Sequence, residues 1–270
     1  KNQYTGGSLK VTGEGTIDAN NKNGTFFLVG TEESGSTKKS TLMIDKNVKL
    51  INGAYAVWVQ HADPAYASYN VKVDIYGSLS GIEPIYVSGN VKGTQGNVPV
   101  IWLHDGANIE VTRYDREVYI GGYAKMIIDK ATITNTVKDG NALTISAGEL
   151  EINGATIIGG DTVGKNVAGS GGAVDVTASS AVFVKQHTTN LPLKITINDG
   201  TFKAAVPFNQ AAGQATTPEP DKITLSIKGG YFVSTGSAAD GSVAVKSADK
   251  TGFISGGYFT SDPTAYKADG

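Results

Sequence analysis

The chain has 270 residues, of which 40% are hydrophobic and 18% are charged, and its formal net charge at pH 7 is −2. Its 35 glycines are typical of a protein built from strands and turns, and the absence of cysteine excludes disulfides and thiolate metal sites. Only two of the basic residues are arginines, Arg113 and Arg116, and no basic stripe is present, so nucleic-acid binding is not expected.

No apolar run approaches the roughly 18 residues of a membrane-spanning helix, so membrane insertion is not expected. The chain starts without Met on the polar stretch KNQYTGGS and carries no signal peptide. We therefore expect a part of a larger multidomain protein. A composition without cysteine is compatible with secretion by a Gram-positive-type bacterium.

One eight-residue pattern recurs along the chain: an apolar residue, any residue, Ile or Val, a small or polar pair, Gly or Ala, Thr or Tyr, and an apolar residue. Looser copies lie at 9–17, 42–50 and 73–81. The clear copies are MIIDKATI (126–133), LEINGATI (150–157), ITINDGTF (195–202), LSIKGGYF (225–232) and GFISGGYF (252–259).

The third residue of this pattern recurs at intervals of 24, 45, 30 and 27 residues, at Ile128, Ile152, Ile197, Ile227 and Ile254. The interval of 45 is close to two repeats. A period of roughly 20 to 30 residues, with β-branched residues alternating and glycine at the corners, is typical of a parallel β-solenoid. Equivalent inward side chains of successive coils are then expected to stack into one continuous core.

A second strand pattern, with apolar residues at its second and fourth positions, lies between copies of the first. Strand alternation sends those two residues inward and the middle one outward. Inward positions include Val57, Val59, Ile85, Val87, Ile101, Leu103, Val118 and Ile120. The copies are AVWVQ (56–60), PIYVS (84–88), VIWLH (100–104), EVYIG (117–121), ALTIS (142–146), AVFVK (181–185), AVPFN (205–209) and SVAVK (242–246).

These patterns predict a single all-β domain over residues 1–270: a single-stranded parallel β-helix of about eight to ten coils. Polar loop insertions are expected at 30–40, 159–172 and 209–221, and residues 252–270 are expected to form the last coil and a cap. Two tandem β-sandwiches are the alternative, but they predict no equivalence between strands along the whole chain.

Three segments carry a resemblance to known proteins. LKVTGEGTIDAN (9–20) resembles the opening coil of right-handed parallel β-helix proteins of the pectin-lyase-like type. NALTISAGELEINGATIIGG (141–160) and GFISGGYFTSDPTAYKADG (252–270) resemble repeats in large adhesin-like surface proteins of gut Firmicutes and their relatives. The resemblance implies a right-handed β-helix that is secreted or attached to the cell wall.

An enzymatic role finds little support among the residues. The Asn-Thr-Asp, Asp-Asp, Gly-His-Gly and Arg-Ile-Lys motifs of polygalacturonase-like β-helices are missing from the sequence. A lyase needs a base and acidic ligands for Ca²⁺, and no other cofactor is expected. The weak candidates for such a site are Asp105, Arg113, Asp115 and Arg116, which also fit a solvated turn.

The outward middle residues form the sharper candidate site. Trp58, Tyr86, Trp102 and Tyr119 are expected to stack on successive coils about 4.8 Å apart, with His104 in the neighbouring outward column. The short spacing from Tyr86 to Trp102 to Tyr119 leaves open that one of these strands lies on another face. Such a column either stabilises neighbouring coils or, if bare, offers a stacking platform for a ligand.

The sequence therefore favours a non-catalytic, extracellular, adhesin-like module that binds a polysaccharide or other glycan, or a host surface protein, through its aromatic residues. Two alternatives stay open. One is a divergent polysaccharide lyase or glycoside hydrolase of the pectin-lyase-like fold. The other is a rigid spacer that presents neighbouring domains.

Overall fold

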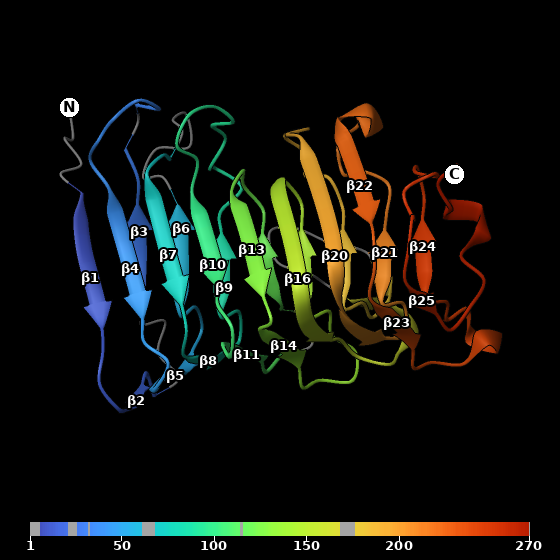
Figure 1. Ribbon diagram of the computed structural model, residues 1–270, viewed down its shortest axis with the longest axis horizontal. Coiled ribbons are helices and arrows are strands. Elements are labelled where there is room, and N and C mark those ends of the chain that lie inside the picture. Colours follow the sequence, from blue (N-terminus) through green and yellow to red (C-terminus); the bar gives the residue numbers. More distant parts are fainter. Residues whose placement is uncertain are drawn as a thin grey trace.

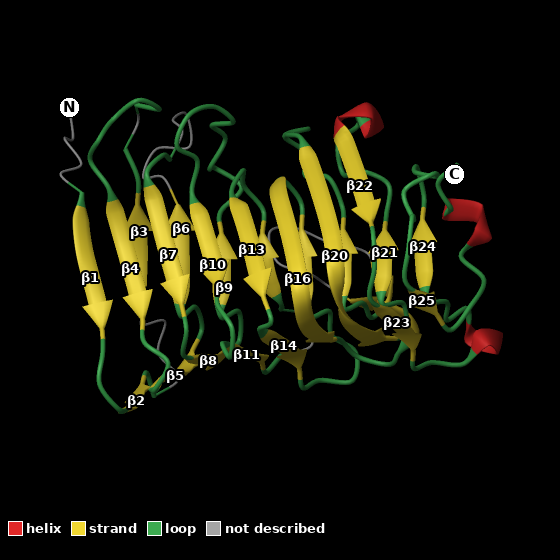
Figure 2. Ribbon diagram, viewed as in Figure 1, coloured by secondary structure: helices red, strands yellow, loops and turns green. Residues whose placement is uncertain are grey.

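The computed structural model describes residues 6–20, 26–31, 33–60, 68–113, 116–167 and 176–269. These residues form strands and their connections, with three short 3-10 helices at Pro220–Lys222, Ala238–Asp240 and Thr264–Tyr266. Figure 2 shows how little of the structure is helical. The prediction of an all-β protein is confirmed.

The strands lie on three faces, which the chain visits in turn, and each strand pairs in parallel with its equivalents before and after it (Figure 1). The first face contains the amino-terminal half of β16 (Gly148–Ile158) and of β20 (Leu193–Ala204). Its other strands are β1 (Gly7–Val11), β4 (Ser40–Ile44), β7 (Val71–Ile75), β10 (Val100–Leu103), β13 (Lys125–Asp129) and β22 (Ile223–Ile227).

The second face follows the first around a corner in the chain. It contains the carboxyl-terminal halves of β16 and β20. Its other strands are β2 (Gly15–Asp18), β5 (Val48–Gly53), β8 (Ser78–Gly81), β11 (Asn108–Val111), β14 (Thr132–Asn135), β23 (Tyr231–Ser234) and β25 (Tyr258–Phe259).

The third face is a separate parallel sheet of eight strands. An antiparallel pair, β17 (Val163–Val167) and β18 (Val176–Ala178), is inserted before its strand β19. The eight strands are β3 (Phe26–Val29), β6 (Val57–Gln60), β9 (Ile85–Val87), β12 (Val118–Ile120), β15 (Leu143–Ile145), β19 (Val182–Val184), β21 (Phe208–Gln210) and β24 (Val245–Ser247). These long parallel sheets are compatible with the predicted β-helix.

The register confirms the repeat read from the sequence. The five isoleucines of the eight-residue pattern pair with one another in order along the first face. Ile152 pairs directly with Ile197, so the interval of 45 residues is one long turn and not two. The extra length includes β17 and β18, so the segment 159–172, predicted as a loop, contains the strand β17.

Two register predictions on the second strand pattern were wrong. VIWLH (100–104) belongs to the first face, where β10 pairs with β7 and β13. The alternation of apolar and polar residues is the same on every face, so it cannot assign a strand to one of them. On the third face, Phe208 and Val245 take the position of Val182, two residues later than AVPFN and SVAVK suggested. Pro207 has no N–H to donate to the ladder, which begins after it.

The inward residues make one hydrophobic cluster that extends from Leu28 to Ile254. All eight predicted inward positions of strands β6, β9, β10 and β12 are completely buried. At the carboxyl-terminal end, Tyr266 packs against Phe253, with ring centroids 5.6 Å apart, and Lys267 forms a bridge with Ile254. The tail therefore lies against the last turn.

Candidate binding site

Three members of the predicted aromatic column do lie together on the third face. Trp58 pairs with Tyr86, and Tyr86 pairs with Tyr119. Their ring centroids are 5.5 Å and 5.7 Å apart, and Tyr55 packs 4.8 Å from Trp58. Sequence reasoning missed Tyr55, because it lies in the connection just before β6 and outside the strand pattern.

This column is covered at its centre. Tyr119 and its neighbour along the column, Thr144, are 1% and 0% exposed, and Phe183 beyond them is 1% exposed. Burial raises the pKa of Tyr119 well above that of an ordinary tyrosine, and burial also raises the pKa of Tyr86. The outward position of Tyr119 is therefore a packed position, and the column mainly joins successive turns.

Trp102 and His104 lie elsewhere, on the first face. Trp102 pairs with Asp74 and Ile127, so it is not a member of the column on the third face. The rings of Trp102 and His104 stack 4.5 Å apart, and Tyr76 stacks on the other side of His104 at 3.9 Å with an interplanar angle of 7°. We call Tyr76, His104 and Trp102 the first-face stack.

Polar side chains fix the orientation of the first-face stack. His104 Nε2 lies 2.9 Å from Asp74 Oδ1, and Lys72 Nζ lies 2.9 Å from Asp74 Oδ2. On the opposite side, Trp102 Nε1 donates a hydrogen bond to Asp129 Oδ2 at 2.7 Å. His104 Nε2 and Trp102 Nε1 thus each have a carboxylate partner, and the stack is held in place without being part of the core.

A groove runs from this stack across the outside of β7, β4 and β1. Its volume is about 490 Å³, and Tyr76, which is 37% exposed, forms one wall. The groove mixes both signs of charge with hydroxyl and apolar groups. The side chains that define it are Lys10, Thr41, Met43, Asp45, Lys72 and Asp74.

Sequence reasoning missed Tyr76 and Asp74. A signal for Tyr76 was present, because it follows Ile75 as His104 follows Leu103, and these two strand residues pair with each other. The signal for Asp74 was its position opposite Trp102 in the neighbouring strand. Both depend on knowing that β7 and β10 share a face.

The structure separates two of the residues weighed for a lyase, Asp105 and Arg113. Asp105 is exposed at the corner between β10 and β11, whereas Arg113 follows the end of β11. The four residues of β11 separate them by about 13 Å. Arg116 Nε lies 3.6 Å from Oε2 of Glu83, a carboxylate that is 1% exposed. Asp115 lies outside the described residues.

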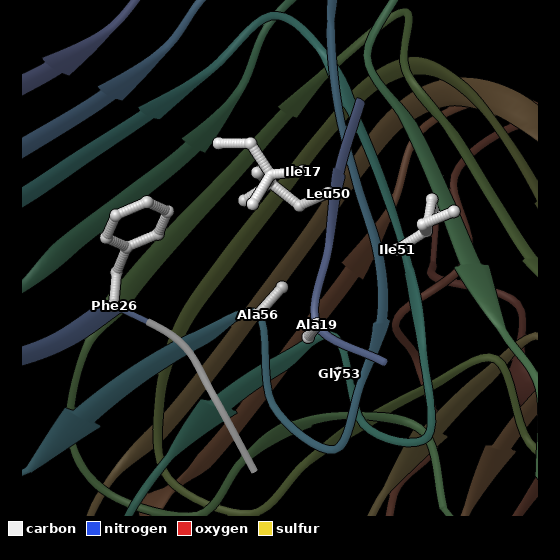
Figure 3. A pocket seen from close by; sticks show the side chains of 7 residues that line it. All are labelled: Ile17, Ala19, Phe26, Leu50, Ile51, Gly53 and Ala56. Atoms are coloured by element: carbon white, nitrogen blue, oxygen red, sulfur yellow. The ribbon is translucent and has the colours of Figure 1, made fainter. Parts of the chain in front are cut away.

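A second pocket, of about 220 Å³, lies at the amino-terminal end of the stack of strands (Figure 3). Figure 3 shows Ile17 and Leu50 side by side, with Phe26 to one side of them. All seven lining residues, from Ile17 to Ala56, are apolar or glycine. Because none of these described residues offers a polar side chain to orient a ligand, they make a poor site for specific recognition.

Within the part of the chain that the structure describes, no group of three or more His, Cys, Asp or Glu side chains is placed to hold a metal ion. In the same residues, no helix has the length and apolar character needed to cross a membrane. Comparisons with protein-family models, with curated proteins and with solved structures found no match.

Proposed function

We propose that this chain is a non-catalytic glycan-binding module, and that its ligand lies in the first-face groove against Tyr76. The observation that carries the proposal is the groove itself, which ends on the exposed ring of Tyr76. That ring stacks on His104, which Trp102 and Asp74 hold in turn. A shaped depression with one aromatic wall and a few fixed polar groups is the usual composition of a small-molecule site.

The chemistry of the groove favours a sugar. The face of an aromatic ring is electron-rich, so it attracts the slightly positive C–H groups on one side of a pyranose. Asp45, Asp74, Lys72 and the hydroxyl of Thr41 supply both acceptors and donors for sugar hydroxyls. Because the two acidic groups are balanced by Lys10 and Lys72, we expect a neutral glycan to be preferred over a strongly charged one.

We propose that the fold is one right-handed parallel β-helix domain of the pectin-lyase-like type. The order in which the chain visits the three faces supports a helix of coils. The nearly universal right-handedness of parallel strand crossovers supports the hand. A secreted or wall-attached position on a bacterial surface, and an adhesin-like role within a larger protein, are supported by the resemblance of 141–160 and 252–270 to such repeats.

The alternative of a divergent polysaccharide lyase or hydrolase has weaker support. Asp105 and Arg113 lie beyond opposite ends of β11, and the guanidinium of Arg116 is already near Glu83. A rigid spacer needs no site at all, but it does not account for three stacked rings at the end of a groove.

The two tryptophans make the proposal testable, since one lies on each candidate face. In the Trp58→Phe variant all tryptophan emission comes from Trp102 on the first face, and in Trp102→Phe it comes from Trp58 on the third. We expect neutral oligosaccharides such as xylo-, manno- and gluco-oligomers, or mucin O-glycans, to change the emission of Trp58→Phe and to leave that of Trp102→Phe unchanged.

Tyr76 provides the matched control. Added to Trp58→Phe, Tyr76→Ala should weaken the titration about tenfold, whereas Tyr76→Phe keeps the ring and should preserve it. A change in the emission of Trp58 alone would indicate that the ligand binds on the third face. No response to any oligosaccharide would favour the spacer, and cleavage of uronic-acid polymers by the wild-type chain would favour the enzyme.

A further inference from the structure

The most exposed large hydrophobic side chains of the described residues are two tyrosines near the carboxyl-terminal end. Tyr231 and Tyr258 are 59% and 58% exposed. They pair with each other on the second face, with ring centroids 6.0 Å apart and an angle of 43° between the rings. Two adjacent bare aromatic rings on a folded surface call for an explanation.

The local sequence fixes these rings in place. Each tyrosine belongs to a GGYF copy of the eight-residue repeat, and the phenylalanine that follows it points into the core. Phe232 and Phe259 stack with centroids 4.8 Å apart and planes within 9°. Phe232 also stacks on Phe202, with centroids 4.6 Å apart. Gly230, at φ +106°, leaves room for Phe202, because a Cβ there would lie 3.1 Å from its ring. The strands that carry the tyrosines are therefore anchored by these phenylalanines.

The outward column that contains the tyrosines continues as a row of hydroxyl groups. Successive strands of the second face present Thr132, Thr156, Thr201, Tyr231 and Tyr258 at paired positions. The three threonines are partly exposed. Neighbouring strands are about 4.8 Å apart, so these groups form a straight strip along the stack of turns. We call it the second-face strip.

We propose that the second-face strip is a second saccharide-binding site, which holds an extended, neutral polysaccharide along the axis of the stack. The tyrosine faces would pack against pyranose rings, and the threonine hydroxyls would donate to and accept from sugar hydroxyls. The strip contains no charged side chain, which fits a neutral polymer and not a uronic-acid chain.

A protein partner fits the strip less well. A stable protein interface buries about 1,200–2,000 Å² and places its aromatic anchors in closely packed pockets. Here the two anchors stand on an open strand surface beside threonines. A polysaccharide needs only a narrow track of this kind. The inference does not depend on the groove of the first face, which lies on other strands.

Affinity electrophoresis tests the proposal with xylan, laminarin, mannan and mucin as the polymers held in the gel. We expect at least one probe to retard the wild-type chain, and Tyr231→Ala/Tyr258→Ala to weaken that retardation about tenfold or more. Tyr231→Phe/Tyr258→Phe keeps both rings and is expected to be retarded like the wild type. Because Tyr231 and Tyr258 are both exposed, circular dichroism should show that both double variants fold like the wild type.

The gel retardation and the Trp102 emission test the two sites independently. Retardation that survives Tyr76→Ala but is lost in Tyr231→Ala/Tyr258→Ala supports the strip even if Trp102 reports no ligand. Equal retardation of the wild-type chain and the double alanine variant by every probe would refute the strip, whatever Trp102 reports. Retention by mucin that persists after enzymatic deglycosylation would also overturn it, because the partner would then be protein.

Discussion

Replacing Phe232 with alanine tests the packing that underlies the carboxyl-terminal turns. Phe232 is completely buried, and it lies between Phe202 and Phe259, with centroid distances of 4.6 Å and 4.8 Å. Phe→Ala in a core costs about 3–5 kcal/mol, and each stacked aromatic pair adds about 0.5–1.5 kcal/mol beyond the area that it buries. Because Phe232→Ala loses two such contacts, we expect a loss at the upper end of the range for core phenylalanines, about 4–5 kcal/mol.

Tyr231 on the same strand is the matched control. It is 59% exposed, so Tyr231→Ala should change the free energy of unfolding by less than about 1 kcal/mol. Urea unfolding followed by circular dichroism measures both variants, with the slope of the transition as the check that the same surface unfolds. A cost below about 1 kcal/mol for Phe232→Ala would refute the reasoning. A larger cost for Tyr231→Ala would mean that the strand is shifted by one residue, since such a slip exchanges the two faces.

Three further predictions concern backbone fit, pH and polar support. Gly148 has φ +90°, and a Cβ there would lie 2.1 Å from the carbonyl oxygen of Ala124, so Gly148→Ala should lower the urea midpoint by the equivalent of about 3 kcal/mol. Burial raises the pKa of Tyr119 above the usual value of about 10, so the unfolded chain loses this proton first. The contribution of Tyr119 to stability should therefore be constant below pH about 10 and fall above it. Urea midpoints at pH 8 and 11 should accordingly fall less in Tyr119→Phe than in the wild type. Asp129→Ala removes the acceptor of Trp102 Nε1 and should cost about 1–3 kcal/mol and change the emission of Trp102, whereas a variant as stable and as fluorescent as wild type would contradict the bond.

The core was predictable from sequence because it obeys a local rule. An apolar residue that alternates with polar neighbours and recurs once per turn must point into the core. For that reason Ile128, Ile152 and Ile197 were correctly predicted to be inward residues of paired strands. The length of a turn obeys no such rule. Between Ile152 and Ile197 an inserted strand pair lengthens one turn, yet β16 and β20 still pair along their length, with only a local register irregularity at Asn153.

The candidate sites were less predictable because outward positions depend on neighbours that are distant in sequence. Trp102 and Tyr86 show the same local pattern, and only the pairing of β12 with β9 reveals that β10 lies on another face. The burial of Tyr119 is likewise a property of what packs over the third face, which its own strand does not encode. Alternation with Phe232 did imply that Tyr231 points outward, so this part of the strip could have been predicted from the sequence.

The three aromatic clusters differ more in their exposure to solvent than in the residues that they contain. Tyr119 on the third face is buried, whereas Tyr76 on the first face and Tyr231 on the second are exposed. The strands β7 and β22 are five turns apart, so about 24 Å of stack separates the groove from Tyr231 of the strip, in addition to the corner between their faces. One short oligosaccharide cannot reach both Tyr76 and Tyr231. If both sites bind, short ligands should therefore occupy them independently, whereas a polysaccharide long enough to reach both should bind more tightly than either site alone allows.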